Sequence, residues 1–108
     1  MAWALRLSTQ AEQDIVDILA WTAVHFSEQQ ARTYSDTLTL ALEALIEGPD
    51  ALGVRSRNDI APGVMTLHVA RGEGKARHFV IFRAGGNSVI DVLRVLHDSM
   101  ELPRHVDH

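Results

Sequence analysis

Two helix-start motifs follow one another early in the chain and restrict how it can fold. Residues 9–12, Thr-Gln-Ala-Glu, and residues 27–30, Ser-Glu-Gln-Gln, both have the spacing of a capping box. In a capping box the first side chain accepts a bond from a free backbone N–H, and the Glu or Gln returns one. The motifs predict a helix capped by Thr9 that ends around residues 24–26, and a second helix that ends at Gly48. Because the connection is so short, the helices should form a hairpin.

Apolar residues recur at helical spacing through both segments. This spacing places them on one side of each helix, so the hairpin should bury that side against another layer. The residues are Ala11, Ile15, Ile18 and Leu19 in the first helix, and Ala31, Tyr34, Leu38, Ala41, Leu42 and Leu45 in the second.

The pattern becomes extended in the second half of the chain. Residues 64–70, 76–83 and 89–96 are rich in Val, Ile, Leu and Phe. The breaks between them, residues 72–75 and 85–88, contain glycines and are typical of hairpin loops. Three strands joined by short loops predict an antiparallel meander.

An additional strand is predicted before the hairpin, where Trp3, Leu5 and Leu7 alternate with other residues. Residues 50–58 are predicted as a polar loop. The resulting order, β-α-α-β-β-β, predicts one α+β domain over residues 1–108. We expect two layers, with the helical hairpin packed on a small, mainly antiparallel sheet.

The middle strand of the meander is apolar on both sides. Arg77, Phe79, Ile81 and Arg83 share one face, while the other face is also largely apolar. The helices can cover only one of them. We therefore expect an open apolar face edged with arginine, which is typical of an interface. The alternative is that the C-terminal tail covers part of that face.

Charge is divided unevenly along the chain. Residues 1–50 carry eight acids and two bases, and residues 51–108 carry six acids and eight bases, although the net charge is -4. Nine of the ten bases are arginine, the side chain suited to bidentate pairing with carboxylate or phosphate. Either an acidic protein segment or a nucleic acid could bind such a surface.

Composition excludes several classes of protein. The chain has no cysteine, so it has no disulfide framework and no thiolate metal site. No apolar run is long enough to span a membrane, and no signal-peptide pattern opens the sequence, so we expect a cytoplasmic protein without membrane contact. His25, His68, His78 and His97 lack ligand spacing, and the pair His105 and His108 is weak. We therefore expect no metal and no cofactor.

The chain resembles a known family over nearly its whole length, most clearly in its second half. The segments are residues 76–83 (Ala-Arg-His-Phe-Val-Ile-Phe-Arg), residues 92–100 (Val-Leu-Arg-Val-Leu-His-Asp-Ser-Met) and residues 101–105 (Glu-Leu-Pro-Arg-His). Together with the element order, they resemble the ParE toxins of the ParE/RelE superfamily, the toxin halves of bacterial type II toxin-antitoxin modules.

The resemblance implies a protein toxin that inhibits DNA gyrase and is not an enzyme. It also implies neutralisation by a ParD-like antitoxin, whose own domain, rather than the toxin, binds DNA. A disordered segment with acidic and apolar residues would complement an apolar face edged with arginine, since folding on binding lets it cover a large area.

Two other functions stay open. A RelE-like toxin would cleave mRNA on the ribosome, with the arginines and histidines of the sheet as candidate groups. The net acidic charge weighs against this function, as does the position of the only tyrosine, Tyr34, on an apolar helix face. A non-toxic module that only binds an antitoxin is the other alternative.

Nine residues are predicted to bind the antitoxin or the target. For His97, a structural role beside Asp98 and direct contact with the target have equal weight. Arg94 is interpreted as the partner of an external acid, with a solvated strand arginine as the alternative. Trp21 is interpreted as a core residue that closes the hairpin with Phe26, with a partner-binding groove as the alternative. The nine residues are Trp21, Arg77, Phe79, Arg83, Arg94, His97, Asp98, Met100 and Arg104.

Overall fold

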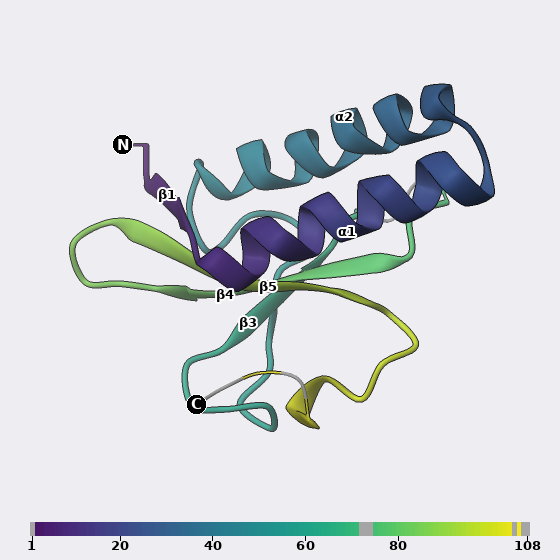
Figure 1. Ribbon diagram of the computed structural model, residues 1–108. Coiled ribbons are helices and arrows are strands. Elements are labelled where there is room, and N and C mark those ends of the chain that lie inside the picture. Colours follow the sequence, from purple (N-terminus) through teal and green to yellow (C-terminus); the bar gives the residue numbers. More distant parts are fainter. Residues whose placement is uncertain (1, 72–74, 105, 107–108) are drawn as a thin grey trace.

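Two helices cover one face of a five-stranded sheet in the computed structural model, which describes residues 2–71, 75–104 and 106 (Figure 1). This confirms the predicted two-layer α+β architecture. In chain order the elements are β1 (Ala4–Leu7), α1 (Thr9–His25), α2 (Glu28–Leu45), β2 (Arg55–Ser56), β3 (Met65–His68), β4 (His78–Ala84), β5 (Val89–His97) and the short 3-10 helix η1 (Leu102–Arg104).

Serine side chains cap both helices. Ser27 accepts a hydrogen bond from the Gln30 N–H at 3.0 Å, as its motif predicts. The predicted cap at Thr9 is wrong by one residue, because Ser8 accepts from the Ala11 N–H at 2.9 Å instead. The hairpin and the end of α1 near residue 25 are confirmed.

The turn after α2 requires glycine. Gly48 has a φ of +127°, and a Cβ there would come within 3.2 Å of Trp3 Nε1. Trp3 in turn donates its backbone N–H to the Ile46 carbonyl at 2.7 Å. The glycine therefore lets the chain turn back closely against the start of β1.

The strand order in the sheet is β1-β5-β4-β3-β2. Strands β3, β4 and β5 form the predicted antiparallel meander, and β1 pairs with β5 in parallel. The prediction that residues 50–58 are only a polar loop is wrong, since β2 pairs with β3 there. The observed strand ends differ from the predicted ones by at most two residues, and the predicted loop at 72–75 lies mainly outside the described residues.

A β-bulge interrupts the pairing of β4 with β5. Ile81 lies opposite Arg94, whereas Phe82 lies opposite Val92, so Leu93 is the extra residue. Both Val92 and Val95 consequently face the helices, although strict alternation would place them on opposite faces. The bulge therefore removes Arg94 from the strict alternation of a regular strand.

One hydrophobic core lies between the helices and the sheet. It contains buried side chains from both layers, and partly buried residues such as Trp3, Ile15, Leu19 and Tyr34 pack against it. The buried members include Ala11, Leu38, Ala41, Leu45, Leu67, Val80, Phe82, Ile90, Val92 and Val95.

The opposite face of the sheet is covered in part by a second core. Figure 1 shows η1 on the side of the sheet away from the helices. Leu102 of η1 and Val106 pack with Ile60, Ala61 and Val64 against buried Ile81 and Leu96. The expectation of a fully open face is therefore wrong, and the alternative, cover by the C-terminal tail, is correct for this part. The loop after β2 adds to the cover.

No helix within the described ranges is long and apolar enough to cross a membrane.

Candidate functional site

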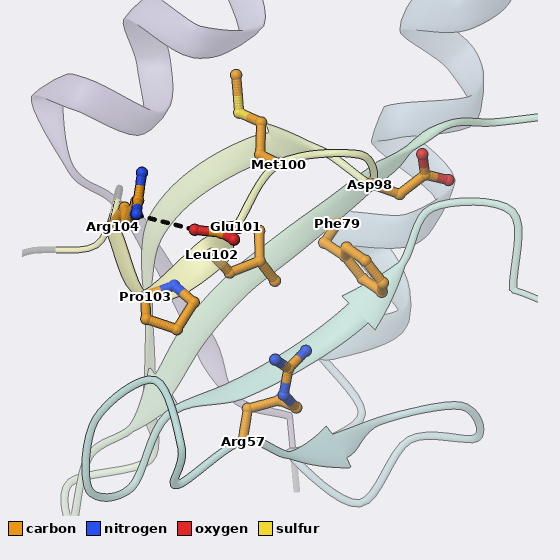
Figure 2. A pocket seen from close by; sticks show the side chains of 8 residues that line it. All are labelled: Arg57, Phe79, Asp98, Met100, Glu101, Leu102, Pro103 and Arg104. Carbon is orange, nitrogen blue, oxygen red and sulfur yellow. Dashed lines mark ion pairs between the residues drawn. The ribbon is translucent and has the colours of Figure 1, made fainter.

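A shallow groove lies at the margin of the second core, where β5 ends and the chain folds back. Its volume is about 580 Å³. Figure 2 shows Phe79 and Leu102 in its middle, with Arg57 on one side and Met100 on the other. Four of the nine predicted binding residues line it, namely Phe79, Asp98, Met100 and Arg104.

The groove combines an apolar floor with charged rims. Leu102 is 4% exposed, whereas Met100 is 42% exposed and offers an accessible apolar surface. Arg57 pairs with Asp59 at 2.8 Å, and Arg104 pairs with Glu101 at 2.9 Å. Because both arginines already have local acidic partners, an incoming acid would have to join or replace these pairs.

Asp98 fixes the point where the groove-forming segment leaves β5. Its carboxylate accepts hydrogen bonds from His68 Nε2 at 3.0 Å and Arg77 Nε at 3.3 Å. Its backbone N–H donates to the Arg77 carbonyl at 2.8 Å. The hydrogen bond from His68, followed by Arg77, lowers the pKa of Asp98, so the carboxylate stays ionised. The predicted residues Arg77 and Asp98 are thus in contact, although the Arg77 side chain is 66% exposed.

A second polar network lies behind Asp98. Tyr34 Oη is 2.6 Å from His78 Nδ1 and accepts the Arg77 backbone N–H at 3.2 Å. The His97 ring meets the His78 ring edge to face, with centroids 5.2 Å apart. Burial lowers the pKa of His78 to about 4, with the neighbouring His97 as the next cause, so His78 is neutral at pH 7. Burial also raises the pKa of Tyr34.

The hydrogen bonds assign the ring protons of these histidines. His68 Nδ1 accepts the Ala70 N–H, and His97 Nδ1 accepts the Ser99 N–H, each at 3.1 Å. The Tyr34 hydroxyl accepts the Arg77 backbone N–H, and His78 Nδ1 at 2.6 Å is the acceptor for its proton among the contacts described, so we assign this nitrogen as the acceptor. All three acceptor nitrogens are therefore bonded within the protein. A histidine general base would need such a nitrogen directed at the substrate.

Three predicted residues lie away from the groove. Trp21 stacks on His25 at 4.2 Å and meets Phe26 edge to face at 5.8 Å. Trp21 is 55% exposed and Phe26 is 67% exposed, so the core interpretation of Trp21 is wrong. Arg83 lies in the last part of β4, in register with Asp91.

Arg94, the third, forms an ion pair within the chain. Its Nε and Nη2 atoms donate to Asp14 of α1 at 2.8 and 2.9 Å. The two side chains are only 21% and 14% exposed. Pairing with an external acid and simple solvation are both wrong for Arg94, because the bulge at Leu93 and the start of α1 bring Asp14 to it.

Sequence reasoning missed several residues of the site. The sequence pattern predicts only a polar loop around Arg57, and it assigns no role to His68 once a metal site is rejected. Tyr34 was placed in the core, and its hydroxyl contacts gave no local signal. Within the described residues, no group of three His, Asp or Glu side chains could hold a metal ion, and His105 and His108 lie outside them.

Comparison with protein families decides the classification. Residues 5–102 match the family described as the ParE toxin of the type II toxin-antitoxin system parDE. The chain belongs to the ParE toxin family. The sequence matched none of the curated proteins with which it was compared.

Two solved structures have the same fold as this ParE toxin. One is the chromosomal ParDE system from P. aeruginosa, with a TM-score of 0.72, 20% identity, and coverage of 89% of this chain and 96% of that one. The other is the RelBE2 toxin-antitoxin complex from Mycobacterium tuberculosis, with a TM-score of 0.59, 17% identity, and coverage of 90% and 99%. At these identities the likeness concerns the fold.

Proposed function

We propose that this ParE toxin arrests growth by binding DNA gyrase, and that a ParD-like antitoxin neutralises it by covering the groove. The observation that carries the proposal is the family match over residues 5–102. Toxin and gyrase would meet in the cytoplasm. The toxin acts here as a protein ligand, with no cofactor and no sequence-specific contact with DNA.

The polar network supports binding over catalysis. An mRNA-cleaving toxin needs a group that takes the proton of the ribose 2′-hydroxyl. The acceptor nitrogens of His68, His78 and His97 are already bonded to groups of the protein. Asp98 is held by His68 and Arg77. RelE-like cleavage is the second candidate, favoured by the structural likeness to the RelBE2 complex.

The two candidates predict different early effects in cells. On induction of the toxin, gyrase inhibition should stop incorporation of labelled thymidine before incorporation of labelled methionine falls. Ribosome-dependent cleavage should reverse this order and produce truncated mRNAs. Loss of methionine incorporation first would therefore contradict the gyrase proposal. Normal incorporation of both labels, with tight antitoxin binding, would indicate the non-toxic module.

The groove proposal predicts that Met100→Asp weakens antitoxin binding. Met100 is an accessible apolar side chain of the groove, and a carboxylate there would lose apolar burial and face a segment that carries acids. We expect the dissociation constant to rise about 30-fold, which corresponds to about 2 kcal/mol. Isothermal titration with the antitoxin measures it.

Leu52→Asp is the matched control. Leu52 is 87% exposed and lies outside the groove, so the same change of charge and polarity should alter the dissociation constant less than about threefold. Equal affinities of the two variants would contradict the placement of the antitoxin on the groove.

A further inference from the structure

Beyond Trp3, whose N–H is bonded to the Ile46 carbonyl, the outer edge of β1 is a sheet edge that no described strand covers. β1 is the last strand in the order β1-β5-β4-β3-β2. The N–H groups of Ala4 and Ser8 donate to carbonyls of the chain around β5, each at 2.9 Å. Backbone groups of successive strand residues point to opposite sides, so those of Leu5 and Leu7 point away from β5. The backbone N–H and C=O groups of Leu5 and Leu7 can therefore form hydrogen bonds with an added strand.

A row of alternating charges crosses the sheet and ends at this edge. The strand register places Arg83 beside Asp91, and Asp91 beside Arg6. Arg6 Nε donates to Asp91 Oδ1 at 2.6 Å, while the Arg6 side chain is 70% exposed. A guanidinium has further N–H donors on its two Nη atoms, which suit a second carboxylate. An acid opposite Arg6 on an added strand would continue the alternation.

The other face of β1 sets the neighbouring positions of such a strand. Leu5 and Leu7 pack against the core between the sheet and the helices. Residues on either side of the acid would point to this same face, because side chains alternate along a strand. The edge is therefore suited to an extended segment in which an acidic residue lies between two apolar ones.

We propose that β1 receives an extended segment of the antitoxin as a sixth strand, with a carboxylate on Arg6 between two apolar residues. This inference rests on the proposed function, because it assumes an antitoxin partner. It concerns a surface separate from the groove. β1 pairs with residues 89–92 at the start of β5, whereas the groove begins after its end, at Asp98.

Amide hydrogen exchange tests the strand addition in the toxin–antitoxin complex. In the free toxin the amides of Leu5 and Leu7 should exchange fast and that of Ser8 slowly, since of these three described amides the Ser8 N–H alone points toward β5 and is bonded to it. Binding of the antitoxin, the protein encoded beside the toxin, should slow exchange at Leu5 and Leu7 by at least about 100-fold. A complex in which these two amides stay fast would overturn the inference.

Arg6→Glu tests the carboxylate contact. We expect this variant to weaken antitoxin binding about tenfold or more, because two acids would then face each other. Arg55→Glu, the same change at an exposed residue on the opposite sheet edge, should change the affinity less than about threefold.

The outcomes separate this inference from the function on which it rests. Tight binding with protected Leu5 and Leu7 amides and a weakened Arg6→Glu variant supports it. Tight binding with equal affinities of the Arg6→Glu and Arg55→Glu variants contradicts the carboxylate contact while leaving the antitoxin partnership intact. No binding of the neighbouring protein at all contradicts the antitoxin partnership and the strand addition together.

Discussion

Replacing Asp14 with alanine should lower the free energy of unfolding by about 3 kcal/mol. Asp14 accepts two hydrogen bonds from Arg94 and one from the Val95 backbone N–H at 3.0 Å. Its side chain is 14% exposed and that of Arg94 is 21% exposed. The alanine variant would leave a largely buried guanidinium without its carboxylate and a backbone N–H without its acceptor. Urea denaturation measures the change.

Two further variants make the interpretation specific. Asp17→Ala removes an exposed carboxylate on the same helix, bonded only to Gln13 at 2.8 Å among the contacts described, and should cost less than about 0.5 kcal/mol. The double variant Asp14→Ala with Arg94→Met should recover part of the loss, because it also removes the largely buried guanidinium that has lost its carboxylate. A loss below about 1 kcal/mol in Asp14→Ala would show that this pair does not hold α1 to β5.

Lowering the pH from 6.5 to 4 should destabilise the protein through His78. Its pKa is lowered to about 4 in the folded protein, mainly by burial, against 6.5 for an ordinary histidine. The unfolded chain therefore takes up a proton within this window and the folded chain does not, so stability falls as the pH falls. Because the ring is only half-buried, we expect a loss of about 2 kcal/mol rather than the full value of the shift.

The prediction is checked by urea denaturation of the His78→Gln variant across the same pH range. The variant should lack most of the loss, since glutamine does not titrate. The control, His25→Gln, removes an exposed histidine on α1 and should keep the wild-type slope. Asp98 affects stability at lower pH than His78 does. The pKa of Asp98 is lowered in the folded protein, so its contribution to stability is lost as the pH falls below 3.8, the ordinary pKa of this carboxyl group. Identical slopes in wild type and His78→Gln would rule out this role of His78.

The helical hairpin and the meander were predictable because their signals are local. Ser27 caps α2 by accepting the backbone N–H of Gln30, only three residues further on. The spacing of apolar residues within each segment indicates whether that segment is a helix or a strand. β2 could not be predicted, because a strand of two residues, Arg55 and Ser56, is too short to show an alternation of apolar and polar side chains. The sheet face away from the helices is covered because Leu102 packs with Ile81, a residue distant in the sequence. No local sequence pattern predicts such a long-range contact.

The candidate site was predictable only in part. One groove contains four of the predicted residues, Phe79, Asp98, Met100 and Arg104. They meet because the chain after β5 folds back over the sheet face that carries Phe79. Arg94 could not be placed, because strict alternation cannot anticipate the bulge at Leu93. Trp21 looks like a core residue in the helical pattern, yet it lies beside Phe26 on the exposed end of the hairpin.

A supercoiling assay with purified gyrase tests the central claim most directly, namely that this ParE toxin acts by binding gyrase. The account predicts that the toxin inhibits supercoiling of relaxed plasmid in proportion to its concentration. One equivalent of antitoxin should restore activity, and the Met100→Asp variant should need more antitoxin for the same relief. Undisturbed supercoiling at every toxin concentration, together with cleavage of mRNA on ribosomes, would contradict the account.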